Sequence, residues 1–136
     1  MKRNSRLSLA MHTLCHMAST PDKQFTSSDI AEHASTNPVV VRRVLGKLRK
    51  AGLMHSEKGH GGGWTLAKDA TQITLADIYI ALDEKLIATD QNISTSNCSV
   101  ERVMHKNVAL VLDDAEKNLI KHFSTFTVDQ LKNEAL

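Results

Sequence analysis

Cysteine, long apolar runs and catalytic motifs are all scarce in this chain of 136 residues. Its two cysteines are too few for a disulfide framework and are compatible with reduced thiols. No segment approaches the roughly 18 consecutive apolar residues of a membrane-spanning helix. The polar residues His12, Thr13 and His16 interrupt the apolar stretch near the N-terminus, which argues against a signal peptide. These absences favour a cytoplasmic protein with no membrane partner.

Enzyme signatures are also missing. The sequence contains no P-loop, no nucleophile elbow and no convincing pair of catalytic carboxylates, and its histidines are scattered. We therefore do not expect an enzyme.

Charge is distributed unevenly, although the net charge is only +2. Residues 1–68 hold 11 Lys or Arg against 4 Asp or Glu, whereas residues 69–136 hold 6 against 11. Such asymmetry suits a protein with one end that faces nucleic acid and another that faces a partner or solvent.

The segment 25–66 reads as two short helices followed by a hairpin. Thr26 and Asp29 form a capping box that starts the first helix, and Asn37 caps a second helix with Pro38 at its first position. This second helix, 37–51, has a stripe of apolar residues spaced as on a buried helix face: Val41, Val44, Leu45 and Leu48.

The opposite face of helix 37–51 is basic. It gathers Val39, Arg43, Gly46, Lys47 and Lys50, with Val40 and Arg42 on its flanks. A solvated charged face is the simpler interpretation, but such helices normally mix both signs, and Pro38 to Gly52 contains no carboxylate. We therefore favour contact with DNA. Gly46 agrees with this, because a better helix former is preferred unless something approaches the backbone closely.

After Gly52, two strands are expected, from Leu53 to Lys58 and from Gly63 to Ala67, around a glycine-rich turn. The bare glycine backbone can approach a phosphate or enter a minor groove, with Lys58 and His60 as polar tips. The hairpin, including the wing 58–64, completes a winged helix-turn-helix. Trp64 and Tyr79 are expected to pack at the core edge and support this wing.

The first helix, from about Arg6 to Ala18, is amphipathic. Cys15 lies on the flank of its apolar stripe, where a cysteine is more often a small core residue than a reactive one. His12 and His16 are four residues apart and can share a face as metal ligands. A histidine pair alone is weak support, so we favour packing against a neighbouring helix and predict no metal.

The rest of the chain predicts a capped helix from Thr74 to Leu82, a long polar loop, and one long helix from about Ser99 to His122. More than one apolar row runs along that helix, which is typical of a helix packed against a partner chain. The expected fold is mainly α with a small β-hairpin wing. Its expected divisions are a DNA-binding domain 1–82, a loop 83–97, and a dimerisation helix with a short terminal helix, 98–136.

Four patterns then resemble one known family: S-x-D-I-A-E, V-L-x-K-L-R-K-A-G-L, G-H-G-G-G-W-T-L-A and I-T-L-A-D-I. Together they are similar to the Rrf-two family of bacterial transcription regulators, which includes IscR, NsrR and CymR. The resemblance covers nearly the whole chain. It implies a homodimer, by analogy a repressor, that reads double-stranded operator DNA with helix 37–51 and the wing, often under control of a sensed signal.

The resemblance also implies positions for DNA contact. The groove-reading positions are occupied here by Asn37, Val39, Val40, Arg42 and Arg43, and the wing positions by Lys58 and His60, with Gly61 and Gly62 beside them. From the residues themselves we add phosphate contacts by Thr26 and Ser28, and positive charge from Lys47, Lys50 and Lys58. Asn37 can instead be consumed as a helix cap. Arg42 and Arg43 replace other polar residues found in many members, and His60 replaces the commoner proline, so the operator sequence does not transfer.

Cluster-binding members of the family place several cysteines in the region of this loop and the following helix start, where this chain has only Cys98. A single thiolate is a poor ligand set for an iron–sulfur cluster, so we predict no cluster and no other cofactor. Two alternatives stay open. One is a thiol-based redox regulator that uses Cys15 or Cys98, the latter near a helix N-terminus. The other is a protein-interaction winged helix that binds no DNA. The sequence identifies no effector.

Overall fold

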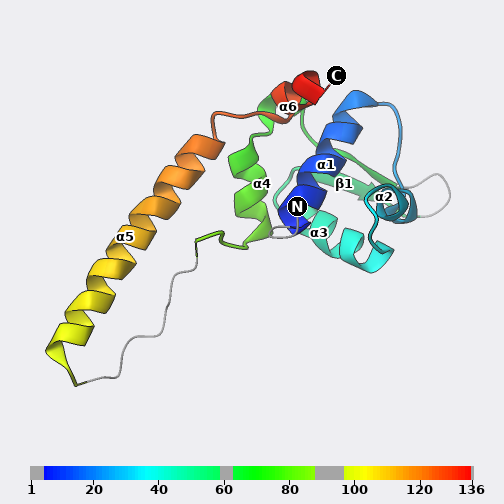
Figure 1. Ribbon diagram of the computed structural model, residues 1–136. Helices are drawn as coiled ribbons and strands as arrows, with labels where there is room; N and C mark the ends of the chain where they lie inside the picture. Colours follow the sequence, from blue (N-terminus) through cyan, green and yellow to red (C-terminus); the bar gives the residue numbers. More distant parts are fainter. Residues whose placement is uncertain (1–4, 59–62, 88–96, 136) are drawn as a thin grey trace.

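The structure is a computed structural model that describes residues 5–58, 63–87 and 97–135. Its elements, in order, are α1 (Ser5–Ser19), α2 (Ser27–His33), α3 (Pro38–Lys50), β1 (Met54–Glu57), β2 (Gly63–Leu66), the 3-10 turn η2 (Ala70–Gln72), α4 (Leu75–Leu82), α5 (Ser99–Phe123) and α6 (Val128–Ala135). The expected fold class, mainly α with one antiparallel hairpin, is confirmed (Figure 1). The division of the chain at residues 83 and 98 stays a prediction.

Local capping interactions start these helices where the sequence predicts. Thr26 and Thr74 accept hydrogen bonds from the backbone N–H groups of Asp29 and Asp77, at 3.0 and 3.1 Å, and both capping boxes are complete. Asn37 accepts an N–H from the first turn of α3. Each bond satisfies a donor that the helix itself leaves without a partner. Helix starts are therefore encoded within a few residues.

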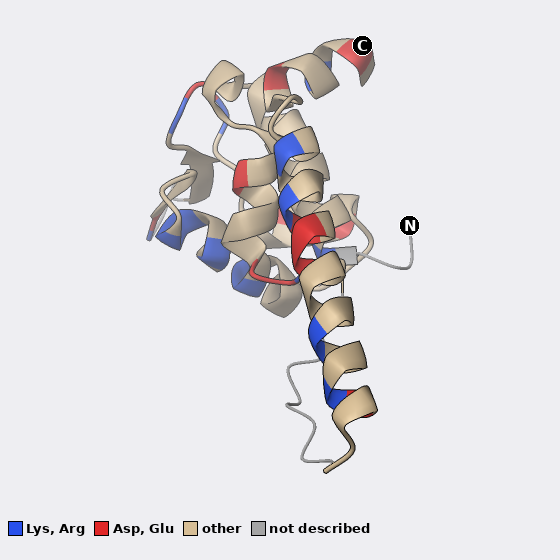
Figure 2. Ribbon diagram, turned by 90° about the vertical axis from the view of Figure 1, so that its left-hand side faces the viewer, with Lys and Arg blue, Asp and Glu red and all other residues tan. Residues whose placement is uncertain are grey.

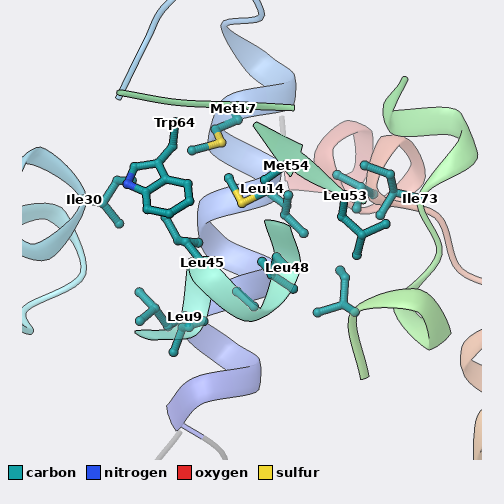
Figure 3. Packing of buried hydrophobic residues seen from close by; sticks show 14 of the residues in the cluster. Leu9, Leu14, Met17, Ile30, Leu45, Leu48, Leu53, Met54, Trp64 and Ile73 are labelled. Carbon is teal, nitrogen blue, oxygen red and sulfur yellow. The ribbon is translucent and has the colours of Figure 1, made fainter. Parts of the chain in front are cut away.

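The core lies where α1, α3, the hairpin, α4 and α6 meet, and α1 passes through its centre (Figures 1 and 3). Its largest fully buried side chains include Leu14, Leu45, Leu48, Met54 and Ile73. The expected apolar stripe of this helix is Leu7, Ala10, Met11, Leu14 and Ala18. Leu9 and Met17 lie outside that stripe but are buried too, so the buried face of α1 is wider than the sequence predicts. The reason is that α1 has neighbours on several sides.

The hairpin pairs Met54 with Leu66 and Glu57 with Gly63. Its second strand also bridges to Phe25, whose backbone exchanges two hydrogen bonds with Trp64. A Cβ added at Gly63 would lie 2.7 Å from the carbonyl oxygen of Phe25, so this bridge requires a glycine. The predicted wing residues His60, Gly61 and Gly62 lie outside the described residues.

Helix α5 extends away from the rest of the molecule (Figure 1). Six of its large apolar side chains are exposed: Val100, Val103, Met104, Val108, Leu110 and Val111. The chain then returns through α6, which packs against α1 and buries Val128 in the core. No helix of the described residues has both the length and the apolar character needed to cross a membrane.

Candidate nucleic-acid interface

The two faces of α3 differ as the sequence predicts. The apolar stripe is at most 1% exposed, whereas Arg42, Arg43 and Lys50 are exposed and Val39 is 56% exposed. Figure 2 shows Lys and Arg recurring along this helix. The buried stripe therefore fixes the orientation of α3 and turns its basic side outward.

Lys47 occupies a special position on this helix. Its Nζ donates a hydrogen bond to the carbonyl oxygen of Leu82 at 3.0 Å and lies 3.5 Å from a carboxylate oxygen of Glu84. Arg6 pairs with the same carboxylate. Partial burial alone would raise the pKa of Glu84, but these two cations hold it below its ordinary value. Lys47 thus ties α3 to the end of α4.

The start of α2 presents Thr26 and Ser28. Thr26 uses its hydroxyl oxygen as a helix cap, and Ser28 is exposed. Between them, Ser27 accepts a hydrogen bond from the indole N–H of Trp64 at 2.9 Å. Trp64 is only 8% exposed, so its predicted packing role is confirmed.

At the start of α3, the side-chain oxygen of Asn37 accepts the N–H of Val40 at 3.0 Å. The capping alternative for Asn37 is therefore the one that the structure shows. Val40 is half-buried and packs against the core. Of the two valines, Val39 is the exposed one, at 56%.

Arg49 was not singled out by the sequence. Its guanidinium donates to the hydroxyl of Ser56 on β1 at 3.0 Å, which links α3 to the hairpin. The next residue after β1, Lys58, is exposed. Only the spatial pairing of α3 with β1 identifies Arg49, because both partners are ordinary polar residues in the sequence.

Gly46 contrasts with Gly63. Apart from its two adjacent residues and the backbone of α3, no described atom lies within 4 Å of a Cβ placed at Gly46. Gly46 also does not have a positive φ angle, the backbone conformation that favours glycine. No contact within the described chain therefore accounts for this glycine in the middle of α3.

The two cysteines lie in different environments. Cys15 is half-buried against the core, and this burial raises the pKa of its thiol, which disfavours the reactive thiolate. Cys98 is exposed at the N-cap position of α5, close to the helix start where the sequence places it. Of the two redox candidates, Cys98 is the more accessible one.

Comparison with known proteins agrees with this geometry. The Rrf2 family profile, described as "Iron-dependent Transcriptional regulator", matches residues 3–134. YwnA of Bacillus subtilis strain 168, an HTH-type transcriptional regulator by name, is 40% identical over 91 residues, which cover 65% of this chain and 66% of YwnA. The HTH-type transcriptional regulator IscR of Photorhabdus laumondii is 39% identical over 62 residues, which cover 46% of this chain and 38% of IscR.

A crystal structure from Lactobacillus plantarum, named as a transcriptional regulator, superposes with a TM-score of 0.82 at 19% identity. The superposition covers 98% of this chain and 90% of that one, and it shows a shared fold. The chain spans less than two thirds of the length of the IscR relative and about two thirds of YwnA. Both curated relatives are named as regulators of transcription rather than as enzymes. The match over residues 3–134, together with the winged helix-turn-helix, places this chain in the Rrf2 family of transcriptional regulators.

Proposed function

We propose that this protein is a cytoplasmic, homodimeric transcription regulator, a repressor, that binds a two-fold operator with α3 and the wing. The observation that carries the proposal is the exposed side of α3. Arg42, Arg43, Arg49 and Lys50 are exposed there, and α3 holds no carboxylate that would neutralise them. DNA is a polyanion, and a basic helix on a winged helix-turn-helix is suited to its major groove.

Arg42 and Arg43 are the proposed base-reading residues, since a guanidinium can bond O6 and N7 of guanine together. Lys50 and Lys58 are proposed to contact phosphates, with Thr26 and Ser28 as hydroxyl donors from the start of α2. Val39 is exposed enough to contact a base edge. His60, Gly61 and Gly62 of the wing are also proposed to contact DNA.

Gly46 and Lys47 of α3 have different proposed roles in DNA binding. Gly46 leaves its stretch of backbone uncovered, which suits the close approach of a DNA strand. Lys47 donates to Leu82, so we expect it to add positive charge and little direct contact.

The proposed dimer is formed by α5. An exposed apolar stripe, with Val100, Met104, Val108 and Val111 on one side of the helix, is costly in water and is covered when two copies pack together. A two-fold dimer presents two α3 helices, which match half-sites one or more helical turns apart.

The test is fluorescence anisotropy of a labelled duplex with purified, reduced protein across a salt series. Direct multi-phosphate contact predicts that log affinity falls linearly and steeply with log salt. A folded dimer that binds no duplex at low salt would contradict the proposal and would favour the protein-interaction alternative.

Arg43→Ala and Lys50→Ala separate base reading from phosphate contact. Arg43→Ala is expected to cost about 1–3 kcal/mol on the operator and to reduce discrimination, whereas Lys50→Ala should weaken all duplexes alike. Both variants are compared on operator and random duplexes by the same anisotropy assay. Equal losses on both duplexes for Arg43→Ala would exclude its base-reading role.

A further inference from the structure

Three histidines from two helices meet at the surface between α1 and α2. His12 and His16 lie one turn apart on α1, and His33 is the last residue of α2. Their ring centroids are 4.5 Å apart for His12 and His16, 5.0 Å for His12 and His33, and 4.3 Å for His16 and His33. The sequence favours packing of the histidine pair against a neighbouring helix, and the residue that it meets there is a third histidine.

The spacing of these rings suits one metal ion. Each ring offers a nitrogen such that the three nitrogens all lie within 4.8 Å of one another, and the Nε2 atoms of His16 and His33 are 2.9 Å apart. In a tetrahedral site with Zn–N bonds of about 2.0–2.1 Å, ligand nitrogens are roughly 3.4 Å apart. The nitrogen separations are thus of the size that such a site needs, and the exposed histidine side chains can rotate to aim them at one centre.

Access and protonation state also suit a ligand set. All three side chains are exposed, and they line a pocket whose other polar residues are Thr13, Ser19, Thr20, Lys23 and Asp29. Partial burial, and then the neighbouring imidazoles, lower the pKa of His12, and burial and His33 lower that of His16. Both shifts favour the neutral imidazole, which is the form that binds metals.

The simpler interpretation is a set of rings packed at tilted and edge-to-face angles, with one hydrogen bond between His16 and His33. That interpretation accounts for one pair of nitrogens. It gives no reason for a third imidazole, that of His12 one turn earlier on α1, whose nitrogen lies within 4.8 Å of the other two.

We propose that His12, His16 and His33 bind one divalent transition-metal ion of the Zn²⁺ class, with a fourth position left open to water. Imidazole nitrogens are ligands that Zn²⁺, Cu²⁺ and Ni²⁺ accept readily, and three of them with one open position form a known zinc arrangement. The ion would clamp α2 against α1. The proposal concerns metal binding alone and holds whether or not the chain binds DNA.

The test is titration of the chelator-treated full chain with Zn²⁺, followed by calorimetry. We expect one Zn²⁺ per chain, and an affinity lower by at least about tenfold in His16→Ala and in His33→Ala. His105→Ala removes an exposed histidine of α5 outside the cluster and should bind Zn²⁺ as the unaltered chain does.

A second probe keeps the test independent of folding defects. His33→Gln retains a polar side chain at the helix end, and circular dichroism checks that each variant is folded. Co²⁺ added to the unaltered chain should give the visible absorption of a four-coordinate site, and His33→Gln should lose it. Zn²⁺ binding of undiminished affinity in folded His33→Ala, or no saturable Zn²⁺ binding to the unaltered chain, would overturn the proposal.

Discussion

The winged-helix body, which comprises α1 to α4, the β1–β2 hairpin and α6, buries its apolar side chains in a common core. Helix α5 is also amphipathic, but six of its large apolar side chains are exposed. In the body, the stripe of α3 is almost completely buried, while Glu116 is the one residue of α5 that counts as buried. The body contains enough elements to cover each apolar face, whereas α5 extends beyond them (Figure 1). The same helical pattern therefore gives a self-contained core in one region and an exposed apolar surface in the other.

Charge separates the two regions as well. On α5, basic and acidic residues are both present, and Lys117 pairs with Asp113 one turn away at 3.2 Å. This is what a solvated helix face looks like. The exposed side of α3 has no acidic residue, so the comparison within one molecule supports a polyanionic partner for α3 and none for the polar side of α5.

The carboxylate of Glu116 links α5 to α4 of the winged-helix body. Tyr79 on α4 donates its hydroxyl proton to Glu116, with oxygen distances of 2.8 and 3.0 Å, and accepts the N–H of Leu86 at 2.9 Å. Tyr79 therefore anchors α5 to the body. The expectation that Tyr79 supports the wing is wrong.

The largest effect is expected from a charge on the apolar side of α5. Val108→Asp places a carboxylate where a second copy is proposed to pack, and it should convert the proposed dimer to a monomer while the rest of the chain stays folded. Analytical ultracentrifugation with circular dichroism measures both. Lys106→Asp on the opposite side is the control and should remain dimeric. A Val108→Asp protein that still sediments as a dimer would move the interface away from this face.

Leucine truncation should next reveal the difference in burial. In the monomeric Val108→Asp background, Leu45→Ala removes a fully buried side chain and should cost about 2–5 kcal/mol of unfolding free energy. Leu110→Ala truncates a leucine that is 60% exposed and should change it by less than about 0.5 kcal/mol. Urea denaturation compares the two, and similar losses would mean that α5 is covered within a single chain.

A smaller loss of stability is expected where Tyr79 on α4 contacts Glu116 on α5. Tyr79→Phe leaves the buried Glu116 carboxylate and the Leu86 N–H without their partner, at a cost of about 1–3 kcal/mol. Glu116→Gln keeps an oxygen that can accept the hydroxyl and should cost less. Urea denaturation of both variants decides. If Tyr79→Phe is as stable as the unaltered chain, the hydrogen bonds of Tyr79 do not hold α5 to the body.

Much of the fold can be predicted from the sequence because its signals are local. The capping residues Thr26, Asn37 and Thr74 act on N–H groups within three residues, and the stripe of α3 repeats within two turns. Such patterns need no knowledge of distant segments. The basic side of α3 follows from them, since fixing the buried side also fixes the exposed one.

Only the tertiary structure decided which distant residues meet. It showed that His33 joins a pair on α1 17 or more residues away, that Lys47 is held by Leu82 35 residues later, and that Gly63 is a glycine because the Phe25 backbone lies against it. The spacing of polar residues along a sequence follows no periodic pattern from which a distant partner could be predicted. The sequence by itself determined where the helices begin and which faces are apolar, whereas packing of those faces against one another set the distances on which ligation and ion pairing depend.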